Sequence, residues 1–289
     1  MSPVARTQSP PTPLFQRGEA NGYPSTIVVA MPGTTALSPA PVSPALTRPP
    51  LAVNLRSARL VYSGLTLFDD LNLDLAGGCL TCLLGSSGIG KSSLLRLLAG
   101  LTAVGISGDL RGGDGLPLTG RVAWMAQQDL LLPWLNVLDN VTLGSRLRGE
   151  PPDRPRALDL LARVGLAEAA LARPDTLSGG MRQRAALART LLEDRPVVLM
   201  DEPFSGLDAL TRLRLQALAA ELLIGRTVLL VTHDPLEALR MGEHILVMNG
   251  RPVTLQPLPD LPGSPPRDPG DAKVQAAYRA ILRLLEVVE

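Results

Sequence analysis

The sequence predicts an α/β fold with a mainly parallel sheet, and three observations support this class. Apolar runs typical of strands alternate along the chain with segments whose apolar residues recur at helical spacing. The runs 197–200 and 228–231 are apolar throughout, which is typical of parallel strands buried on both faces. A glycine-rich stretch, G-x-x-x-x-G-K-S over residues 85–92, stands between a short apolar run and a helical segment.

Composition sets the class of protein. With 289 residues the chain can bury one large core or two smaller ones. Its formal net charge of +1 gives no global field that would attract nucleic acid or anionic lipid. No apolar run approaches the roughly 18 residues that a membrane span needs, and the first residues lack a signal-peptide pattern. We therefore expect a cytoplasmic chain.

The first 50 residues differ from the rest in composition. They hold 11 of the 27 prolines, together with many Ser and Thr, and they show no helical or alternating period. We expect this segment to be a disordered leader, and Met31 offers an alternative start.

Further elements follow from the apolar periodicity of the remaining chain. Strands are expected at 51–62, 67–76, 80–84, 121–126, 197–202, 227–232 and 245–248, and helices at 91–99, 177–192, 208–223, 235–241 and 271–288. Residues 136–172 have helical spacing broken by Gly and Pro, which indicates an all-helical insertion. We expect a loop at 109–120, an edge strand at 245–248 and a linker at 252–270.

The glycine-rich stretch has the context of a phosphate-binding loop. Its glycines let consecutive backbone N–H groups point into one concavity, and the following helix adds a positive field. Lys91 would reach the β- and γ-phosphates, and the Ser92 hydroxyl would ligate Mg²⁺. Only two of the 28 basic residues are lysines, and one of them stands at this position, where a compact ammonium fits best.

The two cysteines, Cys79 and Cys82, are spaced C-x-x-C. Both fall on the apolar strand that enters the loop, where residues three apart face opposite ways. The chain has two histidines, His233 and His244, and no second Cys/His cluster that would complete a zinc site. Buried structural cysteines are therefore expected rather than a redox or metal pair.

Two carboxylates, Asp201 and Glu202, follow the apolar run at 197–200. A phosphate loop and a pair of acids at the end of another strand are the two parts of a site that hydrolyses a Mg-nucleotide. Asp201 would hold Mg²⁺ through water, and Glu202 would orient or deprotonate the attacking water. The simpler alternative is that both acids only end a strand.

A second Gly-Gly at a helix start occurs in L-S-G-G-M-R-Q-R, residues 177–184. It provides a second anion-binding helix N-terminus about 90 residues beyond the first. One chain needs a single phosphate cradle, so two are useful if ATP is held between two copies, with Lys91 of one facing Ser178 of the other.

In order along the chain, these motifs resemble those of the ATP-binding subunit of an ABC transporter, over about residues 51–250. The resemblance implies a P-loop NTPase (ABC ATPase) core with an N-terminal antiparallel β subdomain and an α-helical subdomain at about 130–185. A linker and C-terminal helix would follow at 251–289. It also implies that the chain binds ATP and Mg²⁺ and hydrolyses ATP to ADP and phosphate.

The resemblance implies roles for particular residues. Gln127 matches a glutamine that senses Mg²⁺ and γ-phosphate and couples to the transmembrane partner, and His233 matches a switch histidine that holds γ-phosphate and water. The signature over 178–180 would cap γ-phosphate in trans, and 205–208 matches the D-loop. Tyr62 stands where the family places a ring against adenine.

The implied site therefore has three groups of residues. The catalytic residues would be Glu202, His233, Gln127 and Lys91, and the metal ligands Ser92, Gln127 and Asp201. The nucleotide contacts would be Tyr62, Gly85, Ser86, Ser87, Gly88, Ile89, Gly90, Lys91, Ser92, Ser93, Ser178, Gly179, Gly180 and Asp208. The alternatives are that Tyr62 is only a strand aromatic, that Gln128 takes the place of Gln127, and that His233 is structural.

The expected partners follow from the same resemblance. They are a second copy of the chain, transmembrane permease subunits at the cytoplasmic face of the membrane and, indirectly, a solute-binding protein, with no nucleic acid. The loop at 129–137 is apolar and suits docking onto a permease helix, unless Trp134 and its leucines pack under the helical insertion.

The transporter type rests on a narrower likeness. The Leu-Leu-Pro-Trp run at 131–134 and the short C-terminal extension resemble subunits of nitrate, sulfonate and taurine importers, some relatives of which carry pyrimidine thiamine precursors. Two rival classes are a soluble ABC ATPase acting on ribosomes or DNA, and a P-loop kinase. The first would bring tandem cassettes or basic patches, and the second would leave Ser178 and His233 without a role.

Overall fold

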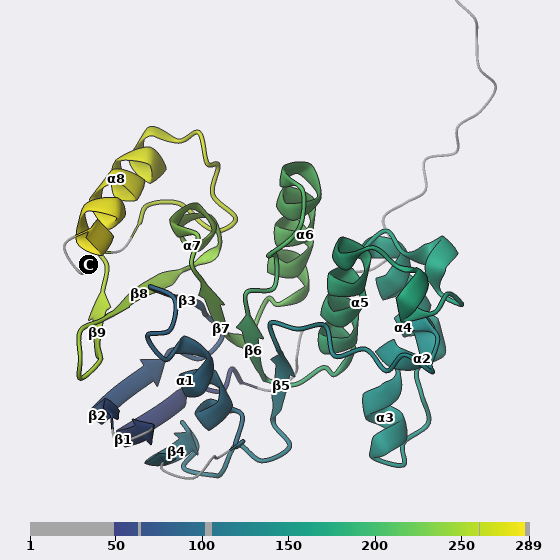
Figure 1. Cartoon of the computed structure of the whole chain (residues 1–289), viewed down its shortest axis with the longest axis horizontal. Helices are drawn as coiled ribbons and strands as arrows, with labels where there is room; N and C mark the ends of the chain where they lie inside the picture. Colours follow the sequence, from purple (N-terminus) through teal and green to yellow (C-terminus); the bar gives the residue numbers. More distant parts are fainter. Residues whose placement is uncertain (1–48, 63–64, 102–105, 260, 287–289) are drawn as a thin grey trace, which may run out of the picture. The chain divides into compact units, whose positions relative to one another are not determined.

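The computed structural model describes residues 49–62, 65–101, 106–259 and 261–286, all within one compact unit, residues 44–289. The expected disordered leader therefore falls almost wholly outside the described residues. Figure 1 shows the arrangement of helices and strands.

The larger sheet has six strands in the order β5-β6-β7-β3-β8-β9 (Figure 1). Five of them, from β5 to β8, pair in parallel, and β9 joins antiparallel. Their bounds are β3 Leu80–Gly85, β5 Val122–Met125, β6 Val197–Asp201, β7 Thr227–Thr232, β8 His244–Asn249 and β9 Thr254–Pro257. The expected α/β fold with a mainly parallel sheet is confirmed.

The end of this sheet differs from the expectation. The strand expected at the edge is β8, which instead lies between β3 and β9, and the outer strand β9 occupies part of the expected linker. The chain turns at Gly250, which has φ +79°, so that Asn249 comes to face Thr254. The prolines at 252 and 257 hid this strand, but prolines are tolerated at a strand's end on a sheet edge.

A smaller antiparallel sheet has the order β2-β1-β4, with β1 Val53–Tyr62, β2 Leu65–Leu75 and β4 Ile106–Gly112. The loop expected at 109–120 is wrong at its beginning, because residues 109–112 belong to β4 and pair with β1. Gly108, just before this stretch, shows why a glycine can stand in this strand. A Cβ there would lie 3.1 Å from Ala58 Cα, so the glycine permits a close backbone approach in a strand.

Helices surround the sheets as the apolar periodicity predicts. The helical insertion contains α2 Val137–Val141, α3 Leu143–Leu147, α4 Arg154–Arg163 and two short 3₁₀ turns, and it leads into α5 Gly179–Leu192. The remaining helices are α1 Lys91–Leu98, α6 Ala209–Leu222, α7 Pro235–Met241 and α8 Ala272–Glu286.

The parallel strands separate two cores. On β3, Cys82 and Leu84 join the core formed with α5, α7 and α8, whereas Leu83 joins the core shared with α1 and the antiparallel sheet. The same alternation holds on β6, where Met200 and Leu199 face opposite cores. Burial on both faces explains the continuous apolar runs in the sequence.

Both cysteines are free. Cys82 is fully buried on β3, and burial raises the pKa of its thiol well above the usual value. Cys79 lies just before the strand and is half-buried, so the expectation that both cysteines are buried on the strand is wrong for Cys79.

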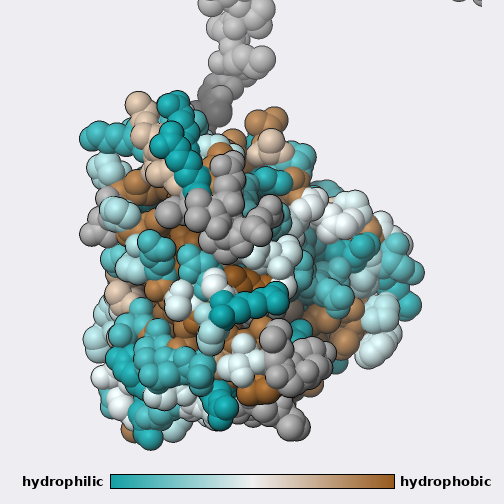
Figure 2. Space-filling view, turned by 60° about the vertical axis from the view of Figure 1, so that its left-hand side comes forward, coloured by the Kyte–Doolittle hydropathy of each residue, from teal (hydrophilic) through white to brown (hydrophobic). Residues whose placement is uncertain are grey.

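Among the described residues, no helix is long and apolar enough to cross a membrane. On the face shown in Figure 2, hydrophilic and hydrophobic residues are interspersed, and neither kind covers the whole face.

Candidate active site

Most of the predicted site residues lie where four neighbouring parallel strands end. β3 ends at Gly85, β6 at Asp201 and β7 at Thr232, and Gln127 follows two residues after β5. Because the carboxyl ends of parallel strands meet at one edge, these segments lie side by side, which is where open α/β sheets bind their ligands.

The phosphate loop joins β3 to α1. Lys91 is buried, and its Nζ donates to the carbonyls of Gly85 and Ser86, both at 2.8 Å. Gly90 precedes the helix in a left-handed conformation, with φ +111°, and offers no side chain to cap it. A Cβ at this position would lie 3.1 Å from the Phe68 ring, so only glycine fits.

This loop fits a polyphosphate. Residues 86–88 are exposed, and a Cβ added at Gly88 would meet nothing within 4 Å, so the concavity is open. The helix start without a side-chain cap adds backbone donors and positive field. Burial lowers the pKa of Lys91, and the charges of Glu202 and Asp201 oppose that shift. The loop lysine and the two acids therefore share one site.

Asp201 and Ser92 form a pair of hard oxygen groups. The Ser92 hydroxyl hydrogen-bonds to the Asp201 carboxylate, whose pKa is raised mainly by burial. Mg²⁺ usually takes one or two protein oxygens and otherwise water and substrate phosphates, so this pair fits the ion. No cluster of three or more His, Cys, Asp or Glu able to hold a metal occurs in the described part of the chain.

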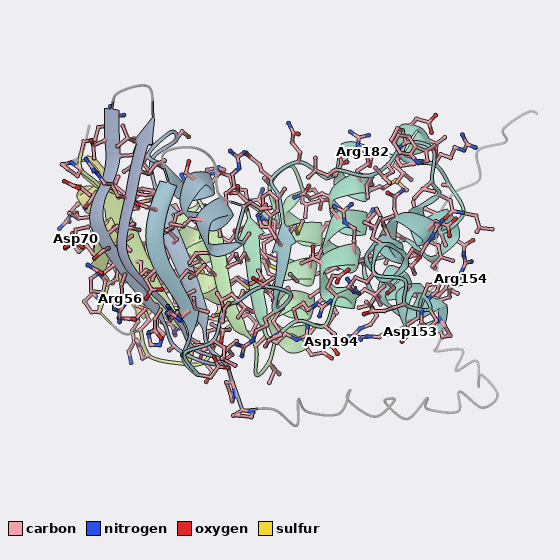
Figure 3. The ribbon with its side chains drawn as sticks, turned by 90° about the horizontal axis from the view of Figure 1, so that it is seen from below. Arg56, Asp70, Asp153, Arg154, Arg182 and Asp194 are labelled. Atoms are coloured by element: carbon pink, nitrogen blue, oxygen red, sulfur yellow. The ribbon has the colours of Figure 1, made fainter. Side chains whose placement is uncertain are left out.

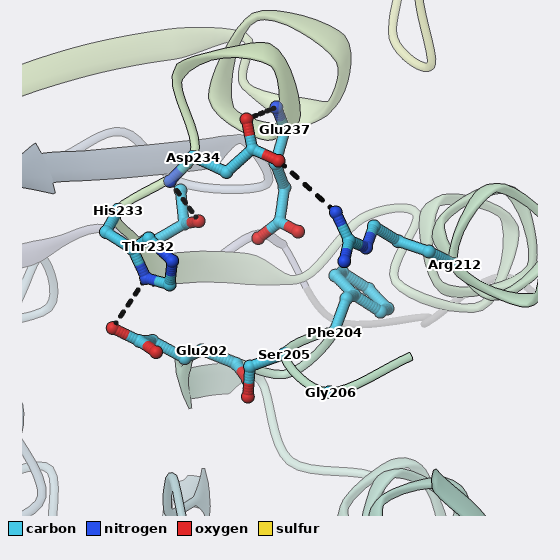
Figure 4. A pocket seen from close by; sticks show the side chains of 9 residues that line it. All are labelled: Glu202, Phe204, Ser205, Gly206, Arg212, Thr232, His233, Asp234 and Glu237. Carbon is cyan, nitrogen blue, oxygen red and sulfur yellow. Dashed lines mark hydrogen bonds and ion pairs between the residues drawn. The ribbon is translucent and has the colours of Figure 1, made fainter. Parts of the chain in front are cut away.

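Glu202 contacts two of the other predicted catalytic residues. Its backbone has φ 48°, a left-handed conformation that a non-glycine residue adopts at some cost and that often marks a functional position. Its carboxylate lies 3.0 Å from His233 Nδ1 and accepts from Gln127 Nε2 at 3.3 Å. Figure 4 shows the Glu202–His233 contact.

The start of α5 lies elsewhere. Ser178 Oγ caps the helix by accepting from the Met181 N–H at 3.3 Å. Figures 1 and 3 show α5 on the far side of β5 and β6 from α1. Arg182, one turn into α5, lies well away from Arg56 and Asp70 of the antiparallel sheet in Figure 3. Within one chain the structure does not bring residues 178–180 to the phosphate loop.

The remaining predicted contacts have other settings. Asp208 caps α6, and the hydrogen bond from Thr211 lowers the pKa of its carboxyl. Gly180 lies beside the D-loop, because a Cβ there would be 3.3 Å from a Leu207 methyl. Tyr62 ends β1, but its side chain lies outside the described residues.

Sequence reasoning missed two sets of contacts. Gln183 Nε2, on the buried side of α5, donates to the carbonyls of Glu202 and Pro203 at 3.4 and 3.2 Å. Behind His233, Glu237 and Gln216 form a buried polar pair. A polar residue on the apolar face of each predicted helix was the available signal.

The chain resembles known proteins in both sequence and structure. The profile of the ABC transporter family matches residues 68–205. An uncharacterized ABC transporter ATP-binding protein of Haemophilus influenzae is 42% identical over 241 residues, which cover 81% of this chain and 98% of the relative. The aliphatic sulfonates import ATP-binding protein SsuB of Delftia acidovorans is 43% identical over 246 residues, covering 84% and 98%.

Among solved structures, a dimeric ATP-binding cassette in a post-hydrolysis state bound to ADP and Pi matches with a TM-score of 0.64. It is 30% identical, and the match covers 73% of this chain and all of that chain.

Proposed function

The chain belongs to the ATP-binding proteins of ABC transporters, and we propose that it powers an importer by hydrolysing ATP between two of its copies. The observation that carries this proposal is the meeting of Lys91, Asp201, Glu202 and His233 at one edge of the sheet. A loop for polyphosphate and a carboxylate for water therefore lie at the same edge of the sheet.

In this proposal, different residues of the chain bind the phosphates, accept the proton and position the water. Lys91 and the first N–H groups of α1 bind the β- and γ-phosphates. Glu202 orients the attacking water and accepts its proton as the water oxygen bonds to the γ-phosphorus and the bond to the β-phosphate oxygen breaks. His233 and Gln127, which both contact Glu202, hold the carboxylate and the water in line.

Ser92 and Asp201 are proposed to hold Mg²⁺. When bound there, the ion would neutralise charge that develops on the phosphate oxygens.

The signature residues require a second copy. Ser178 and Gly179 are exposed at the start of α5, and α5 lies on the far side of β5 and β6 from α1 (Figure 1), so we propose that residues 178–180 contact the γ-phosphate held by a partner. The dimeric form of the solved cassette that this chain resembles supports the same arrangement.

The loop after Gln127 is proposed to dock onto a permease. Trp134 is 66% and Leu130 54% exposed, so the alternative of packing under the helical insertion is wrong for Trp134, whereas Leu131 is buried in the core that the insertion shares. Buried Asn140 holds this loop by accepting from the Leu132 N–H at 2.7 Å and donating to three carbonyls. An exposed apolar side chain on a rigid loop is suited to fill a pocket on a partner helix.

The solute is proposed to be an aliphatic sulfonate, because several relatives at 43–44% identity are named aliphatic sulfonates import ATP-binding proteins. Nitrate, taurine and pyrimidine precursors are the alternatives. The co-purified solute-binding protein should bind a sulfonate more tightly than nitrate or a pyrimidine; the reverse order would overturn this choice of solute.

The ATPase proposal is tested with the purified chain. Wild-type protein should release phosphate from ATP with a specific activity that rises with protein concentration, because the site is completed by a second copy. Lys91→Ala should lose binding of a fluorescent ATP analogue. Hydrolysis that does not depend on protein concentration would contradict the shared site.

The docking surface is tested with the permease complex in liposomes. Trp134→Ala should leave the ATPase rate of the isolated chain within about twofold and weaken permease binding at least about tenfold, the loss of a hot-spot aromatic. Ile224→Ala, which truncates a side chain 75% exposed just after α6, is the control and should bind normally. Equal binding by both variants would overturn the docking surface.

A further inference from the structure

A small pocket lies behind the turn that carries His233, between the D-loop and the start of α7. Its volume is about 110 Å³, and Glu202, His233 and Glu237 are among its lining residues (Figure 4). Glu237 is only 5% exposed and has no role in the hydrolysis proposed above. A buried carboxylate beside a catalytic residue needs a physical reason, because burying it costs free energy.

The contacts of Glu237 lead directly to the residues that flank His233. The Thr232 hydroxyl hydrogen-bonds to the Glu237 carboxylate. The same hydroxyl oxygen accepts from the Asp234 N–H at 3.0 Å. Since a hydroxyl has one proton to donate and lone pairs to accept, both bonds form together when Glu237 is ionised. The carboxylate therefore orients the hydroxyl that holds the turn.

This turn decides where the imidazole lies. The His233 side chain is 60% exposed, so packing restrains it little, whereas the residues on either side of it are held by the bonds just described. The Asp234 carboxylate adds a cap on α7 by accepting from the N–H groups of Leu236 and Glu237. Figure 4 shows His233 projecting from this turn toward Glu202.

The same network reaches α6. Gln216 Nε2 donates to Glu237 at 3.2 Å in a fully buried pair. Arg212, one turn earlier on α6, lies 3.5 Å from the Asp234 carboxylate and donates to the Leu207 carbonyl at 3.1 Å. Because α6 starts directly after Asp208, the His233 turn and the D-loop are attached to one helix.

We propose that Glu237 is a positioning residue for hydrolysis, which holds the His233 turn through Thr232 and fixes that turn to the D-loop helix through Gln216. The inference rests on the proposed ATPase function and assigns a role to residues outside the nucleotide contacts.

The charge state of Glu237 gives the inference a specific signature. Burial raises the pKa of Glu237 to about 7, with Asp234 adding to the shift and Arg212, Thr232 and Gln216 opposing it. Cys82 of β3 faces the carboxylate from the sheet, and His233 and Glu202 line the same pocket. Protonation would remove an acceptor that Thr232 and Gln216 need, so kcat should rise with pH as Glu237 ionises.

The test is Glu237→Gln in the full chain, with Glu221→Gln as the matched control. Glu221 lies on α6, is 59% exposed and pairs only at the surface with Arg163. We expect kcat of Glu237→Gln to fall about fivefold to tenfold with KM for ATP within twofold, and the rise in kcat between about pH 6 and pH 8 to flatten. The control should match wild type in both.

If the Glu237→Gln chain does not fold, a second pair of variants still tests the inference. Thr232→Ser keeps the hydroxyl and should keep kcat, whereas Thr232→Val removes it and should reproduce the loss. Equal kcat for the two Thr232 variants, or an unchanged pH profile in a folded Glu237→Gln, would overturn the inference. A wild-type chain without ATPase activity would instead overturn the proposed function.

Discussion

The phosphate loop and the start of α5 are both glycine-rich helix starts, yet the protein builds them in opposite ways. At the loop, Gly90 leaves the helix without a side-chain cap, Lys91 is buried, and the polar ends of neighbouring strands surround it. At α5, Ser178 caps its own helix and lies exposed. The first is a completed site only in the sense that one chain supplies its loop, acids and histidine, and the second is a donor surface that only another molecule can use.

The largest expected effect is at the completed site. Glu202→Gln should lower kcat by about 10³-fold, because the water loses its base, while ATP binding persists. An ATP-bound dimer should accumulate and be visible by size-exclusion chromatography. Glu221→Gln is again the control, and a Glu202→Gln chain with normal turnover would remove Glu202 from the mechanism.

The donor surface should respond differently. Ser178→Arg should lower kcat about 100-fold, because a long cation blocks the contact with the partner's nucleotide. ATP affinity of the isolated chain should stay within threefold, in contrast to Lys91→Ala. Ser107→Arg, on an exposed position of β4, should behave as wild type. Loss of ATP binding by Ser178→Arg would mean that both helix starts bind the nucleotide of their own chain.

The buried carboxyl of Glu237, next to the completed site, should make the stability of the protein depend on pH. In the unfolded chain Glu237 has its ordinary pKa of 4.5, and in the folded chain it is raised to about 7. The folded state therefore keeps the proton longer, so this group's contribution to stability is full below pH 4.5 and is lost as pH rises through 7. Relative to Glu237→Gln, wild type should lose up to about 3 kcal/mol of unfolding free energy between those limits.

Denaturant melts of both proteins at several pH values measure this difference. A constant difference between wild type and Glu237→Gln across the pH range would show that Glu237 titrates alike in the folded and unfolded chains.

The smallest effect concerns the link between the two regions. Gln183→Leu should cost about 1–2 kcal/mol of unfolding free energy, because the carbonyls of Glu202 and Pro203 lose their donor. It should also lower kcat about threefold by loosening Glu202. Gln128→Leu, an exposed glutamine beside Gln127, is the control. Unchanged stability in Gln183→Leu would show that the hydrogen bonds of Gln183 do not stabilise the link between α5 and the Glu202 segment.

Much of the fold and the site could be predicted from local sequence. Apolar runs identified β6 and β7 because both faces of these strands are buried, and the loop at 85–92 was recognisable because glycine spacing and Lys91 are both local requirements. The order of the parallel strands then brought Lys91, Asp201 and His233 together.

Other features depend on contacts between distant segments. β4 and β9 contain glycine or proline that local propensity assigns to loops, and only pairing with β1 and β8 makes them strands. The bonds of Glu237 to Thr232 and Gln216 join two helices and a strand, which no spacing within one segment could indicate.

The most direct test of the shared site is a crystal structure of Glu202→Gln with ATP and Mg²⁺. We expect a dimer in which the Ser178 hydroxyl lies about 3 Å from a γ-phosphate oxygen of the nucleotide bound to the partner's phosphate loop. A nucleotide-loaded structure in which every Ser178 lies far from any γ-phosphate would contradict it.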